Sequence, residues 1–257
     1  MLENLFSLKG KVALVTGGSR GIGENIALAL AEAGADVIVS SRNRRPPELE
    51  KVAEKIQKLG RKSLAVPANV GKREDVQNLV QKSLQEFGRV DILVNNAGGN
   101  PVIKPFIELE DESFDKVLEI NLKGAFMLSK AVAKQMIKQG GGRIINVTSI
   151  GGVRPGADGL GAYCTSKAAL NMMTQVMARE LAQYNILVNA IAPGSIKTEM
   201  SRANWSDPER AKRRVEDIEL KRFGDPQEIA GLALYLASPA SSFMTGEIIC
   251  VDGGQTL

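Results

Sequence analysis

The sequence predicts an α/β fold: one domain with a seven-stranded parallel sheet and helices on both of its faces. Short β-branched runs alternate with longer helical patterns, which is typical of consecutive β-α-β units. The runs are continuously apolar, as expected for strands that are buried on both faces. Gly34, Gly60 and Gly88 follow helical patterns at the positions where helices end. No linker, repeat or low-complexity tract interrupts the series, so residues 1–257 are interpreted as a single domain.

The elements follow one another in strict alternation. The predicted strands are Val12–Val15, Val37–Val39, Leu64–Val66, Ile92–Val94, Ile144–Val147, Ile186–Ile191 and Ile248–Val251. The predicted helices are Gly21–Ala33, Pro47–Leu59, Glu74–Phe87, Glu112–Lys138, Ala162–Tyr184 and Pro226–Ala237.

A polar segment of helical character, Ser195–Arg222, lies between the last two predicted strands. Loops of this length are often functional. One interpretation is a solvated amphipathic helix on the surface. The other is a lid over the substrate, in which the basic residues attract an anionic substrate. Those residues are Arg210, Lys212, Arg213 and Arg214, and the apolar ones beside them are Met200, Ala203 and Trp205.

The composition excludes several kinds of chemistry. The 257 residues include 33 Lys and Arg against 29 Asp and Glu, a formal charge of +4, with no histidine and two cysteines. Histidine general bases, histidine-dependent nucleophiles and histidine-ligated zinc are therefore excluded. Two cysteines do not make a disulfide framework or a multi-cysteine metal site. We expect acid–base chemistry from Tyr, Lys, Asp, Glu or Cys, and no metal.

The sequence favours a cytoplasmic protein. The residues before the first predicted strand do not form a secretory signal, and no run reaches 18 apolar residues. The basic residues are spread among acidic ones and aromatic residues make up only 4%. We therefore expect neither a membrane nor nucleic acid as a partner.

The first predicted strand leads into a glycine-rich turn. Gly17, Gly21 and Gly23 permit a tight turn and a close approach of the backbone to a pyrophosphate, with Ser19, Arg20 and Ile22 between them. The following helix offers free N–H groups to the same phosphates. This arrangement predicts a Rossmann-type dinucleotide site, although the spacing is Gly-x-x-x-Gly-x-Gly rather than Gly-x-Gly-x-x-Gly. A turn that merely requires positive φ is the alternative.

The end of the second predicted strand indicates which dinucleotide binds. NAD sites place an acidic residue there, bonded to the ribose 2′-hydroxyl. Ser41 and Arg42 occupy that place, whereas Asp36 precedes the strand at its wrong end. Arg42 and Arg20 can form charge-assisted bonds to a 2′-phosphate, so NADP(H) is predicted. The alternative is that both arginines are solvated surface charges.

A tyrosine and a lysine provide the predicted acid–base pair. Tyr163 and Lys167 are four residues apart on a predicted helix and therefore adjoin on one face. A neighbouring ammonium favours the phenolate, whose free pKa is near 10. Ser149 follows the fifth predicted strand, at the sheet edge where ligands bind, and its hydroxyl can donate to a carbonyl oxygen. A buried tyrosine beside a surface lysine is the structural alternative.

These residues, in this order and spacing, resemble the short-chain dehydrogenase/reductase family over roughly Leu8–Leu257. The matching motifs are Thr16-x-x-x-Gly21-Ile22-Gly23, Asn95-Asn96-Ala97-Gly98, Asn121, Ser149, Tyr163-x-x-x-Lys167 and Pro193-Gly194. The resemblance implies that Asn121, Ser149, Tyr163 and Lys167 are catalytic, with Asn121 holding a water through its backbone. Basic residues at the places of Arg20 and Arg42 accompany NADP preference in this family.

The resemblance also assigns further cofactor contacts. These are Asn69, Val70, Asn95, Ala97, Gly98, Tyr163, Lys167, Pro193, Gly194, Ile196 and Thr198. Two features depart from the family pattern. Asn69 stands where many members have an aspartate that contacts adenine, and the interval between Ser149 and Tyr163 is about one residue longer than usual.

The implied activity is NADPH-dependent reduction of a ketone to a secondary alcohol. The sequence is similar to 3-oxoacyl-[acyl-carrier-protein] reductases, which is the first expectation for the substrate, and also to gluconate and other sugar dehydrogenases. An alternative of another class is a non-catalytic NADP-binding regulator. The resemblance further implies a homotetramer. Its subunit interface could be formed by Met172, Met173, Val176 and Met177, and the alternative is that these four residues belong to the core.

Overall fold

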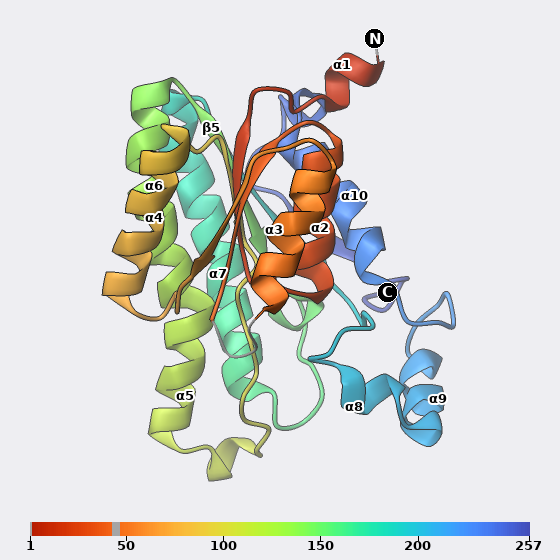
Figure 1. Cartoon of the computed structure of the whole chain (residues 1–257). Helices are drawn as coiled ribbons and strands as arrows, with labels where there is room; N and C mark the ends of the chain where they lie inside the picture. The colour runs from red at the N-terminus through yellow and green to blue at the C-terminus, as the bar shows by residue number, and fades with distance from the viewer. Residues whose placement is uncertain (1, 43–46) are drawn as a thin grey trace.

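A single parallel sheet organises the computed structural model, which describes residues 2–42 and 47–257 (Figure 1). Its seven strands lie in the order β3-β2-β1-β4-β5-β6-β7. The strands are β1 (Val12–Thr16), β2 (Asp36–Ser41), β3 (Ser63–Pro67), β4 (Ile92–Asn95), β5 (Gly142–Val147), β6 (Ile186–Pro193) and β7 (Ile248–Val251). All seven predicted strands are confirmed. One boundary was wrong: Asp36 is the first residue of β2, though still at the end of the strand remote from the glycine turn.

Helices connect the strands and cover both faces of the sheet. They are α1 (Leu2–Phe6), α2 (Gly21–Glu32), α3 (Glu48–Lys58), α4 (Arg73–Phe87), α5 (Asp111–Leu118), α6 (Gly124–Gln139), α7 (Gly161–Leu181), α8 (Arg202–Trp205), α9 (Pro208–Glu216) and α10 (Pro226–Ala237). A π-turn, η2 (Glu119–Lys123), joins α5 to α6, so the predicted helix Glu112–Lys138 is continuous but irregular. None of the helices described is long and apolar enough to cross a membrane.

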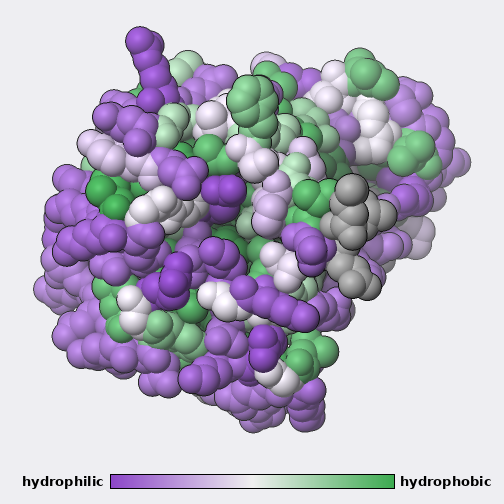
Figure 2. All heavy atoms as spheres, turned by 90° about the horizontal axis from the view of Figure 1, so that it is seen from above, coloured by the Kyte–Doolittle hydropathy of each residue, from purple (hydrophilic) through white to green (hydrophobic). Residues whose placement is uncertain are grey.

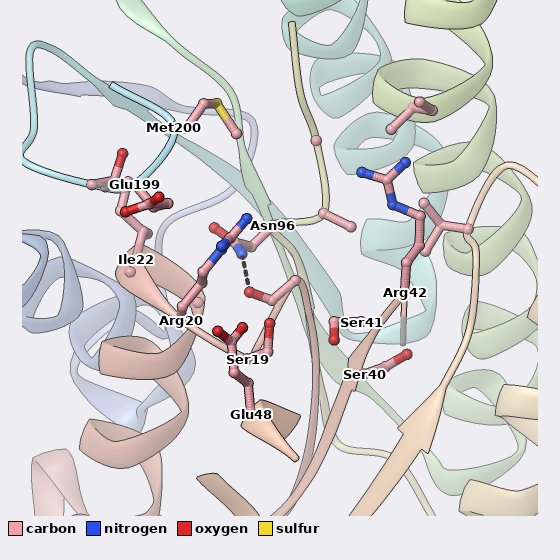
Figure 3. Close-up of a pocket in the computed structure, with 18 of the residues that line it drawn as sticks. Ser19, Arg20, Ile22, Ser40, Ser41, Arg42, Glu48, Asn96, Glu199 and Met200 are labelled. Atoms are coloured by element: carbon pink, nitrogen blue, oxygen red, sulfur yellow. Dashed lines mark hydrogen bonds between the residues drawn. The ribbon is translucent and has the colours of Figure 1, made fainter. Parts of the chain in front are cut away.

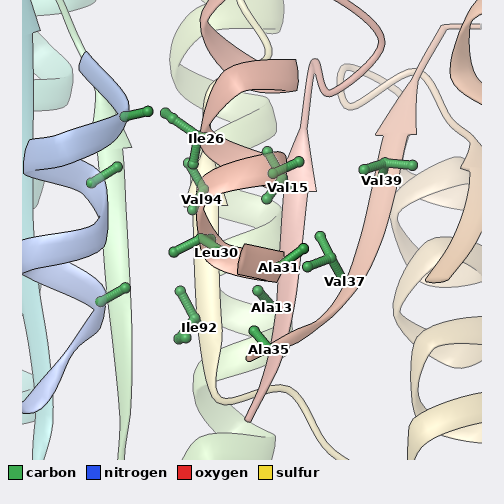
Figure 4. Packing of buried hydrophobic residues seen from close by; sticks show 14 of the residues in the cluster. Ala13, Val15, Ile26, Leu30, Ala31, Ala35, Val37, Val39, Ile92 and Val94 are labelled. Carbon is green, nitrogen blue, oxygen red and sulfur yellow. The ribbon is translucent and has the colours of Figure 1, made fainter. Parts of the chain in front are cut away.

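The two helical layers follow from the alternation of side chains along the strands. Ala13 and Val15 of β1 pack with α2, α3 and α10 on one face, whereas Val12 and Leu14 pack with α4, α6 and α7 on the other. Figure 1 shows these two groups of helices on opposite sides of the sheet, and Figure 4 shows Ile26 and Leu30 of α2 against β1 and β4. Burial on both faces explains why the strands are continuously apolar.

The order of the strands reverses between β1 and β4, which are neighbours in the sheet. Their connections run outward in opposite directions, so a crevice opens at their carboxyl ends, where open α/β sheets bind ligands. The loop after β1 and the loop after β4 meet there. A Cβ added to Gly17 would lie 3.1 Å from the Ala97 backbone.

The segment 195–222 leaves the sheet after β6 and folds into α8 and α9 (Figure 1). Its two ends are joined by a parallel bridge between Ile196 and Gly224. Ile218 and Phe223 are buried and anchor the segment, while the residues of α9 are mostly exposed. The face in Figure 2 is largely polar, with apolar side chains scattered among the polar ones.

Candidate active site

Two adjoining cavities lie at the carboxyl edge of the sheet. One, of about 370 Å³, runs from the end of β2 across the glycine turn. The other, of about 620 Å³, extends from the end of β5 to the segment 195–222. Ile22, Asn96, Gly98, Thr198 and Met200 line both cavities, so they form one continuous cleft. We refer to them as the first and the second cavity.

The glycine turn requires its glycines for steric reasons. Gly17 has φ +64°, and a Cβ there would lie 2.6 Å from Asn96 Nδ2. A Cβ on Gly23 would lie 2.2 Å from the carbonyl oxygen of Gly17. The absence of side chains therefore lets the turn fold onto the start of α2 and leaves its backbone open to the first cavity.

The amino end of α2 faces the first cavity with its backbone donors. Arg20 is the N-cap residue and makes no side-chain hydrogen bond to the helix. The first N–H groups of a helix have no partner within it, and the helix dipole adds positive potential. Ser19, Arg20, Gly21, Ile22 and Gly23 all line the cavity. The donors and the space fit the pyrophosphate of a dinucleotide.

Two arginines stand at the rim of the first cavity, as the sequence predicted. Arg20 belongs to the glycine turn and Arg42 follows β2 directly, and Figure 3 shows them on two sides of the pocket. Ser41 lies at the end of β2 near Arg42. The lining also includes Glu48 and Glu199, which sequence reasoning missed. Glu199 lies 3.6 Å from Arg202.

The remaining predicted contacts at this end of the cleft come from the loops after β3 and β4. Asn69, Val70, Ala97 and Gly98 line the first cavity. Asn69 Oδ1 accepts a hydrogen bond from the Gly71 N–H at 3.2 Å. This hydrogen bond holds the Asn69 side chain in place and occupies its Oδ1. The Nδ2 amino group is therefore the part of the side chain that an adenine can contact.

Asn95 is not where the prediction placed it. It is 4% exposed, lies outside the lining of both cavities, and donates from Nδ2 to Ser129 Oγ at 2.8 Å and to Asn146 Oδ1 at 2.9 Å. Asn146 in turn donates to Thr174 Oγ1 at 2.8 Å. Asn95 therefore connects β4 with α6, β5 and α7 inside the protein. The prediction took the whole motif as one surface, but successive residues of a strand point to opposite faces.

The neighbouring Asn96 takes the place that was predicted for Asn95. Its Nδ2 donates to the carbonyl oxygens of Thr16 at 2.9 Å and Gly17 at 3.2 Å. The bond to Gly17 is dashed in Figure 3. The side chain thereby joins the loop after β4 to the glycine turn, and it lines both cavities. The paired asparagines Asn95 and Asn96 could have indicated this, because neighbouring residues at the end of a strand point in opposite directions. The prediction did not take that alternation of side chains into account.

Ser149 lies in the second cavity at the end of β5, as predicted. It is the N-cap of a short helical turn, η3 (Ile150–Gly152), and its Oγ accepts from the Gly151 N–H at 3.0 Å. That bond uses a lone pair and leaves the hydroxyl hydrogen available to a ligand. The preceding backbone is extended and continues the strand.

Tyr163 and Lys167 come together in the second cavity on the first turns of α7. The Lys167 Nζ lies 5.8 Å from the centre of the Tyr163 ring and donates to the Val147 carbonyl oxygen at 2.9 Å. Burial lowers the pKa of Lys167 to about 8. Burial also raises the pKa of Tyr163, and a hydrogen bond with Ser149 acts in the opposite direction. At neutral pH the pair is therefore a neutral phenol beside an ammonium.

Asn121 lies in the π-turn and is 1% exposed. Its Oδ1 accepts from the Gly99 N–H at 2.8 Å, and its Nδ2 donates to the Gly99 carbonyl at 2.9 Å and to Ser166 Oγ at 3.0 Å. The side chain thus holds the loop after β4 against α7, and it does not line either cavity. Short π-turns are frequent at functional sites. Asn121 thus lies at an irregularity between α5 and α6, and its catalytic role stays a prediction.

The loop after β6 closes the cleft where the two cavities meet. Pro193, Gly194, Ile196 and Thr198 line the second cavity, and Thr198 also lines the first. A Cβ on Gly194 would lie 2.6 Å from Asp252 Cβ, so glycine is required for the chain to pass there. This is the end of the cleft where the prediction placed the nicotinamide carboxamide.

The second cavity also contains residues outside the predicted catalytic and cofactor-binding set, and two of them, Met200 and Arg214, were considered only as part of a lid. Arg154 and Asn204 line it, as do Met200 and Arg214 of the segment 195–222. Arg210, Lys212 and Arg213 line neither cavity. The sequence pattern could not show which basic residue of α9 lines the cavity. That depends on the orientation of α9, which is set by how the segment 195–222 packs on the rest of the protein.

Metal-ligating residues do not gather at the cleft. Within residues 2–42 and 47–257, no group of three or more His, Cys, Asp or Glu side chains is arranged to hold a metal ion. Most polar groups of the cleft are hydroxyl, amide, ammonium and guanidinium groups, which are suited to phosphates and to a carbonyl oxygen, and the acidic lining residues are Glu48, Glu199 and Asp217.

Comparisons with known proteins agree with this geometry. Residues 17–256 match the family model described as Enoyl-(Acyl carrier protein) reductase. The chain is 41% identical to the 2-dehydro-3-deoxy-D-gluconate 5-dehydrogenase of Dickeya dadantii, with 99% of this chain and 98% of that protein covered. It is also 41% identical to the 3-oxoacyl-[acyl-carrier-protein] reductase of Synechocystis, with 98% and 99% covered.

Two solved structures show the same fold over nearly the whole chain. A gluconate 5-dehydrogenase from Burkholderia cenocepacia in complex with NADP and tartrate has a TM-score of 0.93 at 33% identity, covering 100% of this chain and 99% of that one. A 7α-hydroxysteroid dehydrogenase complexed with NADH and a 7-oxo bile acid has a TM-score of 0.93 at 37% identity, with 99% and 97% covered. The chain belongs to the short-chain dehydrogenase/reductase family of oxidoreductases.

Proposed function

We propose that this protein interconverts a ketone and a secondary alcohol with NADP(H) as the cofactor. Gly17, Ser19, Gly21 and the amino end of α2 would hold the pyrophosphate, and Arg20 and Arg42 the 2′-phosphate. The NADP complex of the Burkholderia relative supports this preference, although the steroid dehydrogenase of the same fold binds NADH. The guanidinium groups support it independently, because a 2′-phosphate needs cations where an NAD site has a carboxylate.

The residues of the second cavity supply the proton. When bound, NADPH delivers a hydride to the carbonyl carbon and becomes NADP⁺. The Tyr163 phenol donates its proton to the carbonyl oxygen, so the ketone gains a hydride and a proton in total. Ser149 donates a hydrogen bond to the same oxygen and stabilises its developing charge. The Lys167 ammonium stabilises the phenolate that remains, and a proton from solvent restores the phenol.

One observation carries this proposal: Ser149, Tyr163 and Lys167 converge in the second cavity, which adjoins the phosphate-binding turn. A non-catalytic NADP-binding regulator would need the glycine turn but not the proton donor. The segment 195–222 acts as a lid in this scheme, because Thr198 and Met200 line both cavities.

The proposal is tested by NADPH oxidation against a panel of ketones, with wild type and Tyr163→Phe compared. We expect the variant to bind NADPH with unchanged affinity by fluorescence titration and to lose about 10²- to 10⁴-fold in kcat, the usual contribution of general acid catalysis. Retention of substantial turnover by Tyr163→Phe would refute the catalytic assignment.

A further inference from the structure

We infer that the substrate is a small hydroxy or oxo carboxylic acid, and that Arg214 and Arg154 bind its carboxylate. This inference rests on the proposed function, because it assigns the substrate class of the same site. It selects between the two kinds of substrate that the relatives represent: a free sugar acid and a thioester on a carrier protein.

Arg214 brings a guanidinium group from α9 to the wall of the second cavity. It lies near the carboxyl end of the helix and is only partly exposed, and its Nε donates to Ser195 Oγ at 3.2 Å. That bond orients the guanidinium and leaves its terminal NH groups available to a ligand. In the described part of the chain, Arg214 has no carboxylate within ion-pair distance.

Arg154 lines the same cavity and belongs to the loop that follows Ser149. Its backbone N–H donates to the Ile150 carbonyl at 3.0 Å, which ties the residue to the turn that bears the proposed oxyanion donor. Among the residues described, Arg154 also has no carboxylate within ion-pair distance. Two cations that have no ion-pair partner among the described residues thus line a cavity that contains Ser149 and Tyr163.

The charges around the second cavity favour an anion. Arg154, Lys167 and Arg214 line it, whereas Asp217 is its single acidic lining residue among those described. A guanidinium group pairs with a carboxylate through two parallel hydrogen bonds, which a neutral thioester cannot form. A carrier-bound thioester would instead place a neutral chain beside these two cations.

The other polar side chains of the cavity suit a hydroxylated carbon chain. Asn100 and Asn204 line the cavity together with Ser195. Amide and hydroxyl groups can both donate to and accept from alcohol groups. We therefore assign the carboxylate to the arginine pair, the reacting carbon to the space beside Ser149 and Tyr163, and the remaining hydroxyl groups to these neutral residues.

The inference is tested with D-gluconate and D-glucitol, two six-carbon probes that differ in having a carboxylate or a CH₂OH group at C1. Binding of each to the NADP⁺ complex of the full chain is measured by calorimetry at low salt. The variants are Arg214→Gln and Arg154→Gln, and the control is Arg213→Gln, an exposed neighbour on α9 that lines neither cavity.

We expect gluconate to bind at least about 10-fold more tightly than glucitol, as one hydrogen-bonded charge pair provides. Arg214→Gln should reduce that preference about 10- to 100-fold, Arg154→Gln should reduce it less because it is more exposed, and Arg213→Gln should leave it unchanged. Added salt should weaken gluconate binding only. Circular dichroism checks that each variant is folded.

Equal affinity for both probes, or a gluconate preference that survives in Arg214→Gln, overturns the inference. A failure of the proposed function looks different. In that case Tyr163→Phe keeps its turnover, while the preference for gluconate remains measurable as binding. The two claims therefore succeed or fail separately.

Discussion

Lys167 carries a charge in a place that disfavours charge. The residue is 4% exposed, and one backbone carbonyl, that of Val147, accepts a hydrogen bond from its Nζ. Burial lowers its pKa to about 8, compared with 10.5 for a free lysine. Below pH 8 the folded protein therefore holds a desolvated ammonium that the unfolded chain would hydrate. This desolvation lowers the free energy of unfolding of the protein. The proposed catalytic pair of Tyr163 and Lys167 nevertheless requires the same ammonium.

Replacement of Lys167 by methionine should show this destabilisation through its pH dependence. Between pH 8 and 10.5 the unfolded chain binds more protons at this site than the folded one, so the lysine's contribution to stability rises with pH. The stability of Lys167→Met relative to wild type should thus fall by about 2 kcal/mol from pH 7 to pH 9.5. Urea unfolding of both proteins at fixed concentration measures it. A difference that is constant with pH would show that Lys167 titrates normally.

Arg42 determines cofactor selection in this account. Arg42→Asp replaces a cation by a carboxylate that repels a 2′-phosphate but tolerates a 2′-hydroxyl. The KM for NADPH should rise about 10- to 100-fold, whereas the KM for NADH should change little. NADH serves as the internal control, because both cofactors share every other contact. Parallel increases for the two cofactors would place the phosphate elsewhere.

Residue identity predicted most of the site, and its failures have a geometric cause. Tyr163, Lys167 and Ser149 were found because their chemistry and spacing are restrictive. Asn95 was assigned to the cofactor, but its amide is bonded to Ser129 and Asn146 inside the protein. The sequence did not show that Arg214, and not the basic residues beside it, lines the second cavity. Composition and spacing identify a motif, whereas the direction of a side chain depends on the path of the backbone.

At the scale of elements, the turn η3 (Ile150–Gly152) positions the site by packing on α7. A Cβ on Gly152 would lie 2.6 Å from the carbonyl carbon of Lys167 and 2.8 Å from the nitrogen of Ala168. Both neighbours are backbone atoms of α7, so they cannot move aside easily. The contact holds the turn that bears Ser149 against the helix that bears Tyr163 and Lys167.

Gly152→Ala should therefore separate these two elements. We expect a loss of about 1–3 kcal/mol in stability, typical of overpacking, together with a lower kcat, because Ser149 and Tyr163 no longer share one geometry. Gly231→Ala is the matched control, since Gly231 lies within α10, a Cβ added there would meet open space, and its φ is ordinary. The control should gain up to about 1 kcal/mol and keep its activity. Equal kcat values for Gly152→Ala and Gly231→Ala would show that the packing of η3 on α7 does not affect catalysis.

The elements themselves were largely predictable. The inner strands of the sheet, β1, β2, β4 and β6, are almost wholly buried, so their apolar runs are unbroken and bounded by turn residues. The short helices were not predictable: α1 and α8 span 5 and 4 residues, too few for a periodic pattern to appear. The π-turn at Asn121 was not predicted, because one extra residue in a helical turn hardly changes the apolar spacing.

At the scale of the whole molecule, we propose that apolar side chains on α6 and α7 form a subunit interface in a homotetramer. Met172 is 60% exposed, Val176 46% and Phe126 47%, so these three are not part of the core. Met177, by contrast, packs against the core cluster on that face of the sheet. The alternative of a core stripe is thus excluded for Met172 and Val176.

Sedimentation velocity tests the assembly. Wild type should sediment as a tetramer at micromolar concentration, and Met172→Glu with Val176→Glu should give smaller species, because each charge would be buried in the contact. The unfolded fraction, checked by circular dichroism, should not increase. A wild-type protein that stays monomeric at high concentration would contradict the proposed tetramer.

The whole account depends on the Tyr163 phenol meeting the reacting end of the cofactor where the two cavities join. A crystal structure of the protein with NADP⁺ measures this directly and needs no knowledge of the substrate. We predict the 2′-phosphate between Arg20 and Arg42, and the Tyr163 hydroxyl directed at the space in front of the nicotinamide ring. A nicotinamide bound away from the second cavity, or a phenol oxygen that points away from the ring, would contradict it.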